Sequence, residues 1–252
     1  MGTSASNKGS KGTSPIVPPW ADIDGNGPGP QPDAGRFRGF RREMGKFVTS
    51  GDNKSLQKAL GHYSRNSLGG RGTSVRRFNQ MVVSGGALIG TLNELRNGGS
   101  GVDNAGVNLS RLAGQPVETA IQAIVEAIAP DAGDRELVRA AMQDALIECL
   151  PSGTNFDPTA ITDALLIELI IEYLTQCVFT HIVYESGDAF SKNTNTVAAA
   201  QRENELMELI RIEVDSHATP LLAASSNLGS NQVQNIERSI LADVLDIWET
   251  YE

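Results

Sequence analysis

Apolar residues recur every three or four positions along most of this chain, and nearly all of the sequence from Gln115 onward follows that spacing. Such spacing places apolar side chains on one face of an α-helix. We find no convincing alternation of apolar and polar residues, which would indicate β-strands. The sequence therefore predicts an all-α fold, a helical bundle. Three apolar stripes illustrate the pattern: Val117, Ile121, Ile124, Val125 and Ile128; Val138, Met142, Ala145, Leu146 and Cys149; and Val233, Ile236, Ile240, Val244 and Trp248.

The most apolar stretch is TAITDALLIELIIEYLTQCVFTHIVYESG, residues 159–187. Asp157 and Pro158 supply an N-cap and a first-turn proline, so we expect the longest helix of the chain to begin there. Its polar side is a narrow strip through Glu168, Glu172 and Thr175, as in the central helix of a bundle. About 20 apolar residues would also span a membrane. Two acidic residues near the middle and the lack of flanking Lys or Arg favour the bundle.

Residues 1–35 have a different composition, with seven Gly, six Pro and few aliphatic side chains. This is too little apolar surface to offset the entropy lost on folding. We expect a disordered Gly/Pro/Ser-rich arm with an end-to-end distance on the order of 30 Å. Part of the arm, Asp22 to Asp33, matches the spacing of an EF-hand calcium loop. Prolines interrupt that loop and no helix precedes it, so we expect no metal site.

The net charge of −9 is unevenly distributed along the chain. Residues 1–100 contain 14 Lys or Arg and 6 Asp or Glu, whereas residues 101–252 contain 7 and 24. We therefore divide the chain into the arm (1–35), a basic helical segment (36–100) and an acidic all-α helical bundle (101–252). The two charged parts are expected to meet different partners, or each other.

The basic segment opens with RFRGFRREMGKFV, in which Phe37, Phe40, Met44 and Phe47 follow helical spacing and arginines occupy the other faces. The simplest interpretation is that the Phe stripe packs on the domain while the arginines face solvent or the acidic part. Arginine with interleaved phenylalanine would also suit single-stranded nucleic acid, through phosphate neutralisation and base stacking.

A glycine-rich turn follows at Gly69, Gly70 and Gly72, and Thr73 or Ser74 would cap the next helix. A helix start beside arginines could hold an anion, although glycine turns between helices are common. Farther along, Gly86 and Gly90 would let another helix approach closely. The candidate surface for an anion, a nucleic acid or a partner protein comprises Arg36, Arg38, Arg41, Arg42, Arg71, Arg76 and Arg77.

No set of residues in the sequence indicates catalysis. His62, His181 and His217 are the only histidines, and none has the spacing of a metal site. His181 follows Cys177 by four residues, which would allow a contact on one helix face, but a core histidine whose polar atoms are satisfied by a neighbour is the commoner case. Cys149 and Cys177 lie in apolar helical patterns and no secretory signal is evident, so we expect a cytoplasmic protein without disulfides. We expect no enzyme activity and no cofactor.

Gly2 is the residue of the arm that is best suited to covalent modification. Removal of Met1 would leave an unhindered α-amine, whose pKa of about 7.7 to 8.0 lies well below that of lysine. This terminus would be much richer in the nucleophilic free base near neutral pH than Lys8 or Lys11. Met1, Gly2 and Ser6 also match the short pattern for N-myristoylation.

Several stretches in residues 1–80 together resemble the QatB family, a component of the bacterial QatABCD anti-phage defence systems. They are MGTS, PIVPPWAD, RFRGFRREMGKFV, LQKALGHYSR and GGRGTSVRRF. The resemblance implies a cytoplasmic, non-catalytic protein. Its partners would be a QatC-like relative of deazaguanine synthase, a QatA-like KAP P-loop ATPase and a QatD-like TatD nuclease.

By analogy with related systems, the resemblance also implies that Gly2 accepts a deazapurine, with Thr3 and Ser4 helping the enzyme to recognise the tail. We therefore expect an interaction subunit of a defence complex with a modifiable N-terminus. Two alternatives stay open. One is a nucleic-acid-binding adaptor that uses the basic half, and the other is an N-myristoylated protein associated with a membrane.

Overall fold

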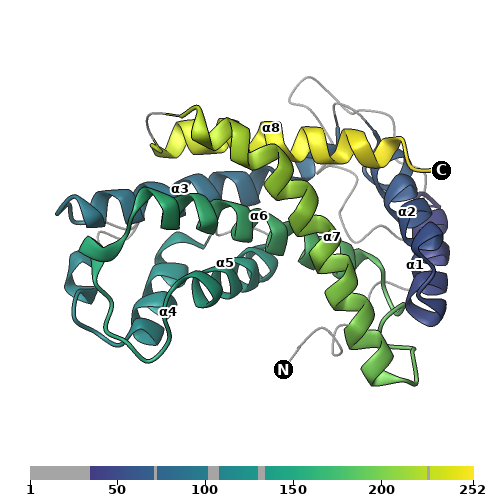
Figure 1. The fold of residues 1–252 in the computed structure, drawn as a ribbon, viewed down its shortest axis with the longest axis horizontal. Helices are drawn as coiled ribbons and strands as arrows, with labels where there is room; N and C mark the ends of the chain where they lie inside the picture. Colours follow the sequence, from purple (N-terminus) through teal and green to yellow (C-terminus); the bar gives the residue numbers. More distant parts are fainter. Residues whose placement is uncertain (1–34, 71–72, 102–107, 130–133, 226–227) are drawn as a thin grey trace. The chain divides into compact units, whose positions relative to one another are not determined.

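The computed structural model describes residues 35–70, 73–101, 108–129, 134–225 and 228–252. Within these residues the chain forms eight α-helices, with short 3-10 and π turns between some of them and no β-strand (Figure 1). The prediction of an all-α fold is confirmed. The helices are α1 (Arg38–Ser50), α2 (Asn53–His62), α3 (Asn79–Arg96), α4 (Val117–Ile128), α5 (Arg135–Cys149), α6 (Asp163–Glu185), α7 (Thr196–Ala223) and α8 (Ser230–Glu249).

The fold consists of two compact units, each assembled from separate stretches of the chain. Unit 1 comprises the described residues of Met1–Phe78 together with Phe179–Ile210 and Leu241–Glu252. Unit 2 comprises the described residues of Asn79–Val178 and Arg211–Ile240. Helices α6, α7 and α8 each contribute residues to both units. The division of the sequence by charge, at residue 100, stays a prediction.

Unit 1 contains the helical hairpin α1–α2, which buries the predicted Phe stripe. Phe40, Met44 and Phe47 are fully buried, and the ring of Phe40 lies 4.8 Å from that of Tyr63. The turn between the helices uses Gly51, whose φ of 73° is left-handed and whose N–H bonds to the carbonyl of Phe47. Asp52 then caps α2 by accepting hydrogen bonds from two backbone N–H groups.

Unit 2 brings α3 close to the first turns of α8. A Cβ atom at Gly86 would lie 2.7 Å from the carbonyl oxygen of Ser230, and one at Gly90 would lie 3.1 Å from the Ser230 Cβ. Only glycine fits such an approach without displacing a neighbour, so the close packing predicted for these two positions is confirmed. The hydroxyl of Tyr173 in α6 donates to the carbonyl of Met81 in α3 at 2.8 Å.

The three apolar stripes lie in α4, α5 and α8 as predicted. Every member is buried except Cys149, which is partly exposed at the end of α5. Both cysteines are free thiols. Helix α4 ends at Ile128, and α5 ends at Cys149, close to the proline at position 151.

The long apolar helix departs from the sequence prediction in two respects. Asp157 caps only a short 3-10 turn, Pro158–Ala160, and α6 begins at Asp163. The longest described helix is α7, with 28 residues against 23 in α6. Along the narrow polar strip, Glu168 is exposed, whereas Glu172 and Thr175 are buried. Glu172 is stabilised by an ion pair of 2.6 Å with Arg211 in α7.

Helix α6 is the one described helix long and apolar enough to cross a membrane, judged by length and composition. Of its most apolar window, 61% is buried inside the protein. That burial agrees with the prediction of a central helix. The helix that was expected to start after Thr73 or Ser74 also begins later, at Asn79, because a 3-10 turn over Ser74–Phe78 comes first.

Candidate interaction surface at the start of α1

The first described residues of unit 1, 35–38, form a turn that is held by hydrogen bonds. The backbone N–H of Arg38 bonds to the carbonyl of Gly35 at 2.9 Å, and the hydroxyl of Ser67 donates to the carbonyl of Arg36 at 3.3 Å. The Phe37 side chain is 6% exposed. Residues 35–37 are therefore anchored by backbone bonds and by a buried ring, and we call them the arm root.

Three arginines surround the Phe37 ring. The guanidinium carbon atoms of Arg36, Arg41 and Arg77 lie 5.3, 5.4 and 6.0 Å from the ring centroid. Guanidinium groups at such distances are attracted by the negative face of an aromatic ring. These three members of the predicted surface therefore turn toward the arm root, where they hold Phe37 in place.

The same arginines surround a buried carboxylate, Glu185, at the end of α6. Its Oε1 atom lies 3.4 Å from Nη1 of Arg77, and both side chains are almost fully buried. Arg41 donates from Nε to the backbone carbonyl of Glu185 at 2.9 Å. Burial raises the pKa of Glu185, and the nearby arginines, Arg77 first among them, partly offset that effect. The pKa of Tyr63 is raised well above its ordinary value by burial and by the neighbouring Glu185 carboxylate.

His181 lies in this unit without acid–base function at neutral pH. Its ring packs 5.0 Å from that of Phe78, and its two nitrogens have no hydrogen-bond partner among the described residues. Burial, with a contribution from Arg77, lowers the pKa of His181 to about 4. The side chain is therefore neutral and belongs to the core, as the sequence indicated, but no described neighbour forms the hydrogen bond that was expected to satisfy it.

The cysteines are not activated either. Burial raises the pKa of Cys149 to about 12 and that of Cys177 well above its ordinary value. A thiol with a raised pKa remains protonated and is a poor nucleophile. Within the described residues, no group of three or more His, Cys, Asp or Glu side chains could hold a metal ion.

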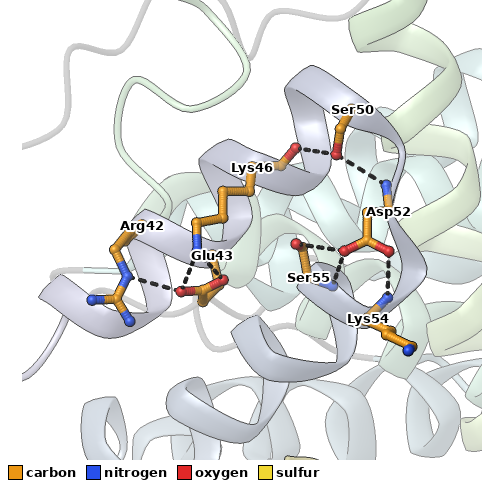
Figure 2. A network of polar contacts seen from close by, with 7 residues as sticks. All are labelled: Arg42, Glu43, Lys46, Ser50, Asp52, Lys54 and Ser55. Carbon is orange, nitrogen blue, oxygen red and sulfur yellow. Dashed lines mark hydrogen bonds and ion pairs between the residues drawn. The ribbon is translucent and has the colours of Figure 1, made fainter.

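Basic residues that face solvent lie along α1. Arg38, Arg42 and Lys46 are all exposed, at intervals of four residues, and we call these three residues the cationic stripe. Glu43 lies between Arg42 and Lys46 and pairs with both, as Figure 2 shows. The Arg42 Nε–Glu43 Oε1 distance is 2.8 Å, and Lys46 Nζ lies 3.0 Å from both carboxylate oxygens. These ion pairs hold the pKa of Glu43 below its ordinary value, against the opposing effect of burial.

An open groove of about 530 Å³ runs beside the stripe, between α1 and the start of α2. Its charged lining is Arg42 and Lys46, and its remaining lining is Gly45, Thr49, Ser50 and Ser55. Ser55 donates to the capping carboxylate of Asp52 at 2.8 Å (Figure 2). A cationic rim with hydroxyl groups can bind acidic side chains or phosphates.

The structure thus separates the predicted surface into an inner and an outer group. Arg36, Arg41 and Arg77 converge on Phe37 and Glu185, whereas Arg38, Arg42 and Arg76 are exposed. Arg71, Gly2, Thr3 and Ser4 lie outside the described residues. Sequence reasoning missed Glu43, Lys46 and Glu185 as parts of the site. The available signal for Glu43 was its position as the lone acidic residue within a basic helix.

Fold and surface define an all-helical protein with exposed cations along α1 and with Cys177 and His181 buried in its core. The chain belongs to the family described as Qat anti-phage system associated protein QatB, whose family model matches residues 69–248. It is thus a component of an anti-phage defence system. Of the five stretches that first suggested this family, only GGRGTSVRRF, residues 69–78, lies within the matched residues, and the other four precede them.

Searches of curated proteins and of solved structures give no match.

Proposed function

We propose that the chain is a non-catalytic partner subunit of its Qat system and that its N-terminal glycine, exposed by removal of Met1, accepts a deazapurine. Family membership carries this proposal. The other Qat components are then its partners: the QatC-like relative of deazaguanine synthase, the QatA-like ATPase and the QatD-like nuclease. Such a complex would assemble in the cytoplasm.

The described side chains support a binding role. The thiols of Cys149 and Cys177 are held protonated, and His181 is held neutral and packed against Phe78. The exposed charges at the start of the helical part are arranged for contact with a partner. Chemistry on this chain would therefore be performed by another subunit, with this chain as its substrate.

Gly2 suits the role of acceptor. Its α-amine has an ordinary pKa of about 7.7 to 8.0, so a substantial fraction is free base near neutral pH. In the reaction, the amine nitrogen would attack the activated carbon of a deazapurine held by the enzyme. The bond between that carbon and its activating group would break, the activating group would leave with the bonding electron pair, and the nitrogen would lose a proton. Glycine has no Cβ and can pass a narrow channel, while Thr3 and Ser4 can add hydrogen bonds that set the register of the tail.

Intact mass of the chain, co-expressed with the other Qat components, tests the proposal. We expect one mass increase, located on Gly2 by sequencing of the N-terminal peptide. Gly2→Pro should abolish it, because proline offers a hindered secondary amine with a fixed φ. Lys8→Arg and Lys11→Arg are the matched controls and should leave it unchanged. An unmodified Gly2 in defence-competent cells would refute the proposal, and an increase matching a myristoyl group would favour the lipid alternative.

A further inference from the structure

Two of the three cations in the cationic stripe are held in place by ion pairs. The side chains of Arg42 and Lys46 are 63% and 56% exposed, whereas that of Glu43, to which both bind, is 5% exposed. The buried carboxylate therefore fixes the positions of two exposed cations. Side chains that are already held in place lose less conformational entropy when a partner binds.

The stripe presents guanidinium and ammonium groups that can bind carboxylates. Arg42 contacts Glu43 through Nε, so its two terminal nitrogens are not part of that contact. Lys46 and Arg42 both line the groove of about 530 Å³, and Arg38 continues the same face one helical turn earlier. Guanidinium and ammonium groups bind carboxylates by charge-assisted hydrogen bonds. A surface bearing Asp and Glu side chains fits this face.

The position of the stripe relates it to Gly2. Arg38 is the first residue of α1 and follows directly on the arm root at residues 35–37. Residues 1–34 precede that root, and from their Gly- and Pro-rich composition we expect them to span on the order of 30 Å. An enzyme that holds Gly2 in its active site therefore has the start of α1 within its reach.

We infer that the cationic stripe is the docking surface for the enzyme that modifies Gly2, and that this enzyme presents an acidic protein surface to it. The inference rests on the proposed function. The place of the stripe in the chain favours this enzyme over a nucleic acid, because the stripe follows directly on the arm root that leads to Gly2. A phosphate backbone would be attracted by the same cations, so the test below includes an oligonucleotide.

Docking at the stripe raises the local concentration of Gly2 at the active site. A short flexible linker between a docking site and a reactive group gives effective concentrations on the order of millimolar. The stripe therefore acts on binding of the chain and leaves the chemical step itself unchanged.

Binding of the full-length chain to the purified deazaguanine-synthase relative tests the inference, with Gly2→Pro present throughout to prevent turnover. Arg38→Glu is the first variant, because an acidic residue in the first turn of a helix is stabilising and the fold is retained. Arg38→Glu with Lys46→Gln is the second, since Arg42 stays paired with Glu43. Arg111→Glu, an exposed position in unit 2, is the matched control.

We expect the double variant to weaken binding roughly tenfold at low salt, as for the loss of two or three exposed ion pairs. The difference should shrink as salt rises, and Arg111→Glu should bind like the parent. An unchanged Kd of the double variant would overturn the inference. So would retained enzyme binding together with lost affinity for a single-stranded oligonucleotide, which would assign the stripe to nucleic acid.

The same variants, made in a chain that keeps Gly2, separate the proposed modification of Gly2 from the inferred docking at the stripe. Absence of modification in the wild-type chain refutes the proposed function alone, because the binding assay does not depend on turnover. Modification at the wild-type rate in the double variant, at chain concentrations below KM, refutes docking at the stripe alone.

Discussion

Glu185 and Glu237 are both fully buried, but their surroundings differ in charge. Glu185 lies beside Arg77, with Arg41 and Arg36 near enough to favour its ionised form. The charge that opposes the effect of burial at Glu237 in α8 is that of Arg238, and the two carboxylate oxygens of Glu237 have no hydrogen-bond partner among the described residues. Burial therefore raises the pKa of Glu237 well above its ordinary value. A charged Glu237 would be costly, so the folded state favours the protonated acid.

The raised pKa of Glu237 should make the free energy of unfolding depend on pH. Because the folded-state pKa of Glu237 is raised, the folded protein binds a proton more tightly than the unfolded chain does. The resulting stability is complete below the unfolded pKa of about 4.3 and is lost as the pH rises toward the folded pKa. Glu237→Gln removes this loss. We expect its melting temperature to exceed that of the wild type at pH 7 by a few degrees, about 2 to 4 °C per kcal/mol, and the gain to fall toward pH 4.

Glu168→Gln, an exposed position on α6, is the matched control for Glu237→Gln and should leave the melting temperature unchanged at both pH values. Thermal unfolding followed by circular dichroism gives the comparison. A gain in stability that is the same at pH 4 and pH 7 would show that ionisation of Glu237 is not the cause.

Among the helices, glycines have opposite roles in α1 and α3. At Gly45 in α1, a Cβ atom would have no described atom within 4 Å outside its own helix and its chain neighbours. At Gly86 in α3, it would lie 2.5 Å from Cγ of Gln234 and 2.7 Å from the carbonyl of Ser230, both in α8. Gly45 therefore lowers the stability of α1, because glycine has a low helix propensity. Gly86 permits contact between two helices of unit 2.

Alanine at these two glycines should therefore change stability in opposite directions. Gly45→Ala should stabilise the protein by about 0.5 to 1 kcal/mol, the usual gain in a helix interior. Gly86→Ala should destabilise it by about 1 to 3 kcal/mol, because α8 must shift to accommodate a methyl group. Urea unfolding of both variants beside the wild type measures the two values. If Gly86→Ala also stabilised the protein, the close approach of α3 and α8 would be wrong.

The elements that sequence reasoning predicted correctly are those with a local cause. The stripes of α4, α5 and α8 follow from the spacing of their own apolar residues, and all but one of those side chains are buried. The start of α6 was wrong because the Asp157 cap and Pro158 are also satisfied by a single 3-10 turn. The burial of Glu172 within the polar strip was not predicted, because its ion-pair partner Arg211 lies 39 positions farther along the chain. No local pattern contains that information.

For the predicted arginine surface, too, the local sequence does not show which side chains face solvent. Composition indicates that the segment is basic, and its Phe stripe indicates the buried face of α1. Whether a given arginine points outward depends on residues far along the chain, since Arg41 and Arg77 both contact Glu185. The sequence could therefore predict that a cationic surface exists near the arm, but it could not separate Arg38 and Arg42 from Arg36, Arg41 and Arg77.

For the molecule as a whole, the uneven charge is partly neutralised within each unit. In unit 1, Arg77 from the basic segment pairs with Glu185 from the acidic part. In unit 2, Arg96 pairs with Asp163 at 2.6 Å. Opposite charges from the two parts of the sequence therefore meet in both units, in the core at Glu185 and at the surface at Asp163. The cationic stripe on α1 is the surface that we propose for a partner.

The arm root sets the boundary between the part of the chain that stabilises the fold and the part that does not. The composition of residues 1–34 predicts no contribution to a core, whereas Phe37 is buried among Arg36, Arg41 and Arg77. A chain beginning at Gly35 should therefore melt within about 1 °C of the full-length protein. A chain beginning at Gly39 loses Phe37, and deletion of a buried phenylalanine costs about 3 to 5 kcal/mol, or on the order of 10 °C for a chain of this size. Differential scanning calorimetry of the three chains makes the comparison, and a large drop on removal of residues 1–34 alone would show that the arm is part of the folded core.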